Sequence, residues 1–86
     1  MVPAIVLIKA QAGRVGELGQ ELADTDGVYS AYSVAGDEDL VALVRAVGHE
    51  ELADIVTTRI SKLPGILSTR TLIAFRAYSS EDLANV

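Results

Sequence analysis

Two short polar segments of this 86-residue chain hold the side chains best suited to bind a small ligand. The first is the run 36–39, Gly-Asp-Glu-Asp, in which three carboxylates stand beside a glycine whose backbone can approach a ligand closely. The second is the run 68–71, Ser-Thr-Arg-Thr, in which polar side chains interrupt a largely aliphatic stretch. Each segment also has a plainer interpretation, the first as a solvated turn and the second as an edge strand kept polar against aggregation.

Other combinations that could bind a metal or support catalysis are incomplete. The run 24–27 resembles part of a calcium loop, but aligning its glycine with that of the loop puts Leu22 in the first ligand position. His49 lacks a second histidine four residues later, so we interpret it as a helix cap or first-turn residue rather than a zinc ligand. The chain shows no Ser/His/Asp arrangement, no phosphate-binding glycine loop, no Cys and no Trp. We expect a protein that is not an enzyme, binds no metal and uses no cofactor.

Charge and composition narrow the remaining functions. The formal charge is −5, and the seven basic residues are scattered along the chain, so direct nucleic-acid binding is not expected. The absence of cysteine fits a reducing compartment. The first apolar run, residues 4–8, is cut off by Lys9 and is too short for a signal-peptide core or a membrane span. We expect a cytoplasmic protein without membrane contact.

The elements that must position the two polar segments repeat one unit. Hydrophobic periodicity and turn residues predict strands over 2–10, 28–34, 40–47 and 66–77, and helices over 14–24 and 49–63. Aligning Gly27 with Gly65 places Leu22 on Ile60, so each half is a helix that ends in a glycine and enters a strand at equal spacing. The buried stripe of the second helix is expected to include Leu52, Ile55, Val56, Ile60 and Leu63.

Two β-α-β units joined by a hairpin predict an α+β fold of ferredoxin-like βαββαβ order. In this fold a four-stranded antiparallel sheet has strands one and three in its centre, strands two and four at its edges, and both helices on one face. We expect one domain over residues 1–78. Residues 79–86 are interpreted as a frayed or partner-contacting tail, since they hold too few apolar residues for an independent helix.

The predicted central strands are apolar on both faces, although the helices can cover only one. A second apolar face of about 600–800 Å² would represent on the order of 15–20 kcal/mol of unrealised burial before the costs of association. We therefore expect this face to close a dimer. The alternative is that one face is lined mainly by alanines and stays exposed.

Taken together, the two polar segments carry a family resemblance. The glycine-x-x-aspartate hairpin at 36–39, which runs into an aliphatic strand, and the Pro64-Gly65 pair, which precedes an aliphatic strand with two threonines, resemble the effector domain of Lrp/AsnC transcription regulators, the RAM domain. The likeness extends from Val2 to about Tyr78. Full-length regulators of this kind carry a helix-turn-helix domain ahead of it, and a first strand that begins at Val2 resembles the stand-alone version.

This resemblance implies face-to-face dimers that assemble into an octamer or decamer, with a small amino-acid effector held between neighbouring dimers. The backbone around Gly36 would receive the ligand carboxylate, and Asp37 or Asp39 would pair with the ammonium, while Thr69 and Thr71 would supply hydroxyls. The resemblance also implies a role in transcription regulation through assembly with partners such as a full-length Lrp/AsnC regulator. Two alternatives are a small dimeric ferredoxin-like enzyme of the monooxygenase type and a pure assembly subunit that binds no ligand.

Overall fold

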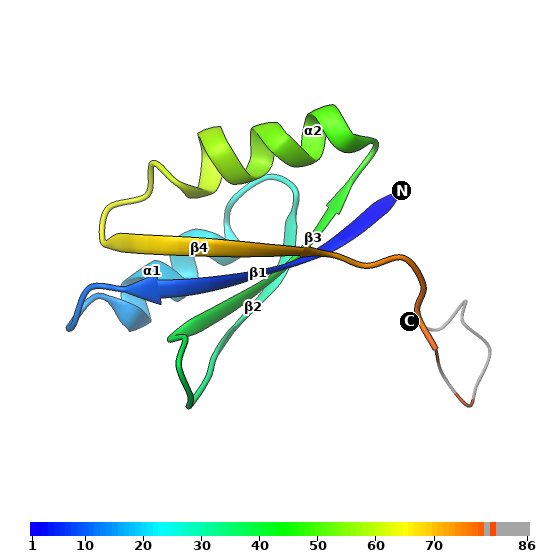
Figure 1. Cartoon of the computed structure of the whole chain (residues 1–86). Coiled ribbons are helices and arrows are strands. Elements are labelled where there is room, and N and C mark those ends of the chain that lie inside the picture. Colours follow the sequence, from blue (N-terminus) through cyan, green and yellow to red (C-terminus); the bar gives the residue numbers. More distant parts are fainter. Residues whose placement is uncertain (79, 81–86) are drawn as a thin grey trace.

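Four strands form a single antiparallel sheet with its central strands where the sequence predicts them. In the computed structural model, which describes residues 1–78 and 80, the sheet order is β2-β3-β1-β4 (Figure 1). The fold is ferredoxin-like α+β, as predicted. The predicted tail over 79–86 lies outside the described residues except for Ser80. The elements in chain order are β1 (Val2–Ala10), α1 (Val15–Ala23), β2 (Val28–Ser33), β3 (Leu40–Ala46), α2 (His49–Asp54), the π-helix η1 (Ile55–Ile60) and β4 (Ile66–Ile73).

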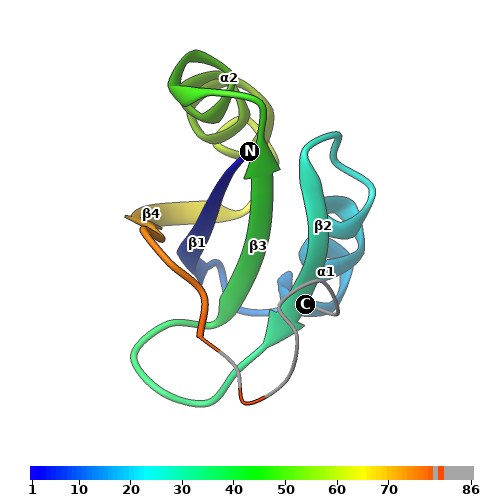
Figure 2. The same ribbon diagram turned by 90° about the vertical axis from the view of Figure 1, so that its right-hand side faces the viewer.

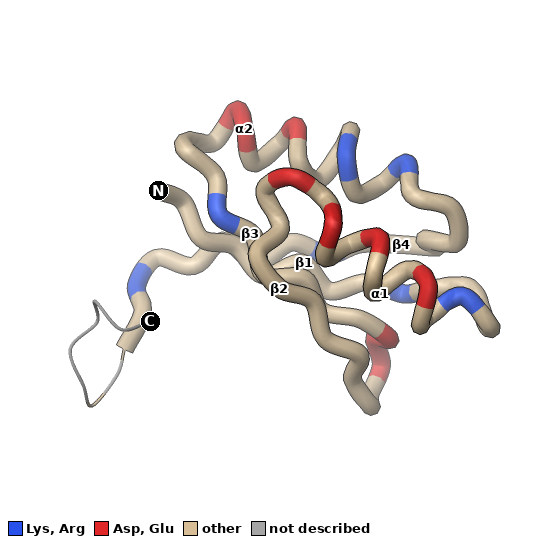
Figure 3. The backbone as a smooth tube through the Cα atoms, turned by 180° about the vertical axis from the view of Figure 1, so that it is seen from behind, with Lys and Arg blue, Asp and Glu red and all other residues tan. Residues whose placement is uncertain are grey.

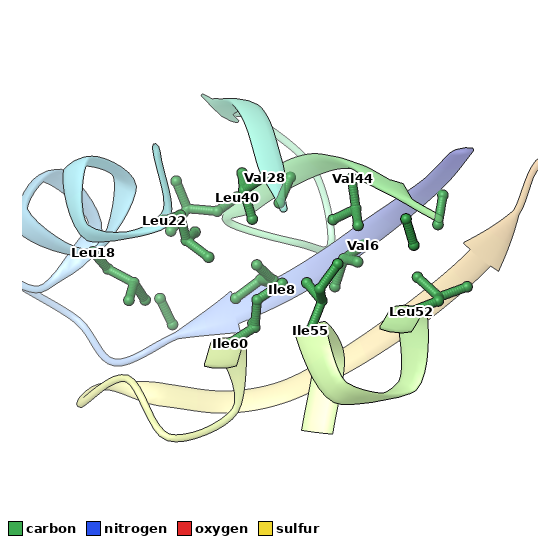
Figure 4. Packing of buried hydrophobic residues seen from close by; sticks show 14 residues of the cluster. Val6, Ile8, Leu18, Leu22, Val28, Leu40, Val44, Leu52, Ile55 and Ile60 are labelled. Atoms are coloured by element: carbon green, nitrogen blue, oxygen red, sulfur yellow. The ribbon is translucent and has the colours of Figure 1, made fainter. Parts of the chain in front are cut away.

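Both helices pack on the same face of the sheet (Figure 2). Alternate residues of β1 and β3 point to that face, and the close view in Figure 4 shows their side chains meeting those of the helices. Burying an aliphatic side chain contributes about 1.5–3 kcal/mol, so this layer is the main source of stability. The largest fully buried side chains are Val6, Ile8, Leu18, Leu22, Leu40, Val44, Ile55 and Ile60.

The second helix changes from α to π geometry at Ile55. Ile55 and Ile60 are both 0% exposed, and their spacing of five residues matches the i→i+5 bonding of a π-helix. The Ser61 N–H donates to the Val56 carbonyl oxygen at 3.1 Å, which closes the last wide turn. The sequence predicted one helix to residue 63 with Val56 on its buried stripe. The wide turn instead leaves Val56 only partly buried beside the core.

Two arginines connect the repeated halves in equivalent ways. Arg14, just before α1, donates from Nη2 to the Pro64 carbonyl oxygen at 2.9 Å. Arg59, in η1, donates from Nη1 to the Asp26 carbonyl oxygen, also at 2.9 Å. The two carbonyls immediately precede Gly27 and Gly65, whose φ angles are similar, 99° and 96°. The predicted duplication is therefore visible in the backbone. An arginine from each half of the chain therefore forms a hydrogen bond to the turn that precedes the last strand of the other half.

The last strand is shorter than the sequence predicted. β4 ends at Ile73 rather than at residue 77. The Ala74 N–H donates to the Pro3 carbonyl oxygen at 3.0 Å, but Pro3 has no N–H to return the bond, so the β1–β4 ladder stops there. The chain then leaves the sheet, and Phe75 and Tyr78 are 96% and 85% exposed (Figure 1).

Candidate functional site

The turn that joins β2 to β3, residues 34–39, has the open glycine that the sequence predicted. Gly36 has a φ of 150°, a backbone conformation that residues with a side chain rarely adopt. Apart from its chain neighbours, no described atom lies within 4 Å of the point where a Cβ would stand. The Val34 N–H closes the turn by donating to the Asp39 carbonyl oxygen at 3.0 Å. The backbone at Gly36 is therefore open to approach by a ligand.

The three carboxylates of this turn have different surroundings. Oδ2 of Asp39 accepts the Ala10 N–H at 2.8 Å, so this half-buried carboxylate anchors the turn to β1. Glu38 forms an ion pair with Arg70 of β4, with 3.3 Å between Oε1 and Nη2. Asp37 is exposed, and its carboxylate makes no hydrogen bond or ion pair with any described residue. Of the two aspartates that the sequence nominated as ammonium partners, Asp37 is the one with both oxygens available.

The two predicted threonines lie on β4, on the face of the sheet that carries the helices. Thr69 pairs with Ile8 and Thr71 with Val6, and both partners belong to the core. β1 separates β4 from β3, and no hydrogen bond between described residues joins the threonines to the turn 34–39. One protomer thus brings Gly36, Asp37 and Asp39 into one loop, which the Glu38–Arg70 ion pair joins to β4 between Thr69 and Thr71.

A groove of about 270 Å³ lies between the second helix and β4. Thr57 on its wall donates its hydroxyl to the Ala53 carbonyl oxygen at 2.6 Å, whereas the Thr71 hydroxyl makes no hydrogen bond with a described residue. Sequence reasoning missed this groove because it depends on how the second helix packs against β4, which the residue pattern of either element does not specify. The groove is lined by His49, Leu52, Ala53, Val56, Thr57, Thr71 and Ile73. His49 itself is the first residue of α2, as predicted.

The other face of the sheet is apolar at its centre and carries no helix. Strand register places Leu43 and Val41 of β3 opposite Ile5 and Leu7 of β1 on this face, all only partly buried. Tyr32 of β2 and Leu72 of β4 flank them at 54% and 48% exposure. The predicted second apolar face is confirmed. The alternative, a face lined mainly by alanines, is wrong, because the alanines of the central strands lie on the covered face. We call this surface the open sheet face.

Charge is distributed without a concentrated basic surface over the described residues. Figure 3 shows acidic residues on the two helices, the α1–β2 loop and the β2–β3 turn, whereas basic residues are spread over several elements. Within residues 1–78 and 80, no group of three or more His, Asp or Glu side chains is arranged to hold a metal ion. None of the helices in this part of the chain is long and apolar enough to cross a bilayer.

The fold and these surfaces define a small α+β domain with an open glycine turn, an apolar groove and an uncovered sheet face. A family model described as the Lrp/AsnC ligand binding domain matches residues 3–83, and the chain belongs to this family. The resemblance seen in the turn and in the threonine strand is confirmed.

Three similar proteins illustrate the relationship. The chain is 31% identical over 75 residues to the HTH-type transcriptional regulator FL11 of Pyrococcus horikoshii, a match that covers 87% of this chain and 49% of the regulator. It therefore spans about half the length of the curated relatives that it matches. TTHA0845 from Thermus thermophilus, which has a crystal structure, is 49% identical in sequence to this chain, and the two structures superpose with a TM-score of 0.86. The match covers 92% of this chain and 99% of TTHA0845. The feast or famine regulatory protein Rv3291c from M. tuberculosis, solved in complex with L-methionine, is 28% identical with a TM-score of 0.72, over 95% of this chain and 56% of that one.

Proposed function

We propose that this chain is an effector-binding and oligomerisation module of Lrp/AsnC regulators, which binds a small amino acid and acts in transcription regulation through assembly with partners. The observation that carries the proposal is the turn 34–39, in which an open glycine backbone stands beside the exposed carboxylate of Asp37. The family match and the methionine complex of a relative support the same ligand class. The proposal includes a cytoplasmic location, because a regulator acts where DNA is transcribed.

A free amino acid needs donors for its carboxylate and an acceptor for its ammonium. Backbone amides near Gly36 can supply the donors, and Asp37 the charged acceptor. Asp39 contributes by holding the turn against β1, since one of its oxygens already accepts the Ala10 amide. The turn can therefore hold both charged ends of the ligand within one short loop.

We further propose that the site is completed by a second chain. No hydrogen bond between described residues joins the turn to Thr69 or Thr71 in one protomer, and we place the ligand between the turn of one chain and the β4 of a neighbour. A ligand that binds only the closed assembly stabilises it by mass action. Ligand binding and assembly would then be linked, which gives the module its regulatory output.

The assembly itself would form in two steps. Dimers close through the open sheet face, and contacts around the turn 34–39 and β4 join the dimers into an octamer or decamer. Stable interfaces bury about 800 Å² on each partner, and the open sheet face, with Ile5, Leu7 and Leu43 at its centre, is the surface that we propose for this contact. A full-length Lrp/AsnC regulator is a further partner that we propose for the open sheet face.

Calorimetry with the common amino acids tests the ligand. The parent chain should bind at least one of them below millimolar concentration, and Gly36→Val should abolish binding. The matched control is Gly13→Val, because Gly13 also has a positive φ, 86°, and open space at its Cβ, but lies outside the turn. If no amino acid binds below millimolar concentration, or if Gly36→Val binds as well as the parent, the ligand site is wrong and the chain is a pure assembly subunit.

Light scattering tests the assembly. The parent should have the mass of an octamer or decamer at micromolar concentration, and Leu43→Asp, on the open sheet face, should give folded monomers because it buries a carboxylate in the dimer. Thr58→Asp, on the exposed side of η1, is the control and should assemble like the parent. Circular dichroism checks the fold of each variant. Val44 is unsuitable as a probe of the dimer, because it is 0% exposed in the core and an aspartate there would unfold the domain. A parent that stays dimeric would contradict the ring and favour the enzyme alternative.

A further inference from the structure

The turn 34–39 is attached to β1 through its last residue. The Asp39 N–H donates to the Ile8 carbonyl oxygen at 2.9 Å, and Oδ2 of Asp39 accepts the Ala10 N–H at 2.8 Å. Residues 34–37 are exposed, and they include the glycine and the aspartate that the proposed site uses. The position of these two residues therefore depends on how the second half of the turn is held.

Glu38 is the second point at which the turn is held. Its Oε1 lies 3.3 Å from Nη2 of Arg70, and no other basic residue of the described chain pairs with it. The Glu38 side chain is only 18% exposed, so without Arg70 its carboxylate would stand partly desolvated and unpaired. The carboxylate would then turn out into water, and the backbone of the turn would move with it.

Arg70 reaches the turn from the opposite side of β1. Successive side chains of a strand point to opposite faces, so Arg70, which pairs with Leu7, lies on the open sheet face, whereas Thr69 and Thr71 lie on the face with the helices. β1 lies between β4 and β3, so the guanidinium crosses it to reach Glu38 (Figure 2). The ion pair thus joins the turn to the threonine strand without placing Arg70 beside the threonines.

We propose that Arg70 is a positioning residue of the amino-acid site, which acts through its ion pair with Glu38 to hold Gly36 and Asp37 in the conformation that binds the ligand. The inference rests on the proposed function and adds to it a pair of side chains that do not touch the ligand. The pair prepares the turn, and the Gly36 backbone and the Asp37 carboxylate make the contacts.

The turn needs this support because its own backbone restrains it little. Gly36 has a φ of 150°, and apart from its chain neighbours no described atom lies within 4 Å of the point where a Cβ would stand. A turn that is released from Glu38 must be ordered again when the ligand binds. Ordering the backbone of one residue corresponds to about 5–30-fold in affinity. Exposed ion pairs contribute little to global stability, and Arg70 is 67% exposed, so the pair should affect binding far more than unfolding.

The test is a double-mutant cycle measured by calorimetry of the full chain, with the common amino acid that binds the parent most tightly as the probe. Arg70→Met keeps the aliphatic stem without the charge, and Glu38→Ala removes the carboxylate. Each should weaken binding by about 5–30-fold. The double variant should lose no more than either single variant, because both changes remove the same interaction.

Two matched controls make the same changes of charge elsewhere. Lys62→Met and Glu50→Ala alter exposed side chains that have no described partner, and both should bind like the parent. Urea denaturation should give the parent's midpoint for Arg70→Met and Glu38→Ala, which separates positioning from a general loss of stability. Light scattering must show the parent's mass for both, because Arg70 lies on the face proposed to close the dimer.

Exchange of the two charges supplies the rescue. Glu38→Arg combined with Arg70→Glu restores an ion pair between the turn and β4 and should recover most of the affinity that either single change loses. Weak binding by Arg70→Met with parent-like binding by Glu38→Ala would mean that Arg70 contacts the ligand itself, and would overturn the inference, as would losses that add in the double variant. Parent-like binding by both single variants would also overturn it and leave the amino-acid site at the turn intact. Failure of the parent to bind any amino acid would overturn the proposed function together with the inference.

Discussion

The carboxylate of Asp39 is predicted to stabilise the fold rather than to recognise the ligand, and its removal separates the two roles. β3 begins at Leu40, which pairs with Ile8, so beyond that point β1 has no β3 residue to accept its amides. Oδ2 of Asp39 takes the place of the missing strand by accepting the Ala10 N–H at 2.8 Å. Asp39→Ala would leave a buried amide unpaired, since Ala10 is only 8% exposed.

The expected cost follows from this geometry. Hydrogen bonds to charged groups contribute about 1.5–3 kcal/mol, so Asp39→Ala should lower the free energy of unfolding by about 2 kcal/mol. In a domain of this size that corresponds to a fall in Tm of about 8–16 °C. Asp39→Asn, whose amide oxygen can still accept the Ala10 N–H, should lose about half as much because the acceptor is neutral. Asp37→Ala should change the free energy by less than about 0.5 kcal/mol, since Asp37 is exposed and has no described partner.

Urea denaturation followed by circular dichroism measures these differences. All variants must be compared at one protein concentration and without amino acids, because both association and ligand binding shift the apparent stability. Calorimetry then gives the opposite order for ligand binding, with Asp37→Ala the more damaging variant. Equal unfolding midpoints for Asp39→Ala and Asp37→Ala would refute the structural role of Asp39.

Three further predictions test the core, a tight backbone contact and the surface charge. Ile60→Ala should destabilise the chain by about 2–5 kcal/mol in the same urea assay, because Ile60 is 0% exposed; a loss below about 1 kcal/mol would contradict its place in the core. Gly27→Ala should be more damaging than Gly13→Ala, since both have positive φ but a Cβ at Gly27 would lie 2.5 Å from Cδ1 of Ile55; equal losses would show that this contact relaxes freely. The isolated chain should give no gel shift with duplex DNA at sub-micromolar concentration and physiological salt, because its formal charge is −5 and its basic residues are scattered; a specific shift would contradict regulation through partners alone.

Local pattern was sufficient to predict most of the fold. Alternation in residues 2–10 and 40–46, together with the polar hairpin between two strands, identified the strands and their order. The repeat of Gly27 at Gly65 identified the duplicated unit, because both glycines occupy the same backbone conformation ahead of a strand. These features depend on residues close together in the chain, where side-chain periodicity and turn chemistry act directly on the backbone. The second apolar face could be predicted for the same reason.

Only the tertiary structure decided which residues of the candidate site have structural partners and which are open to a ligand. Asp37 and Asp39 are alike in sequence, and only the position of the Ala10 amide, across the β1–β3 boundary, gives one of them a structural partner. Val56 matched an α-helical stripe as well as Ile60 did, but in the structure Ile60 is buried whereas Val56 is only partly buried and lines the groove. Contacts of this kind join residues far apart in the chain. They depend on the distance and orientation of packed elements, which local periodicity does not specify.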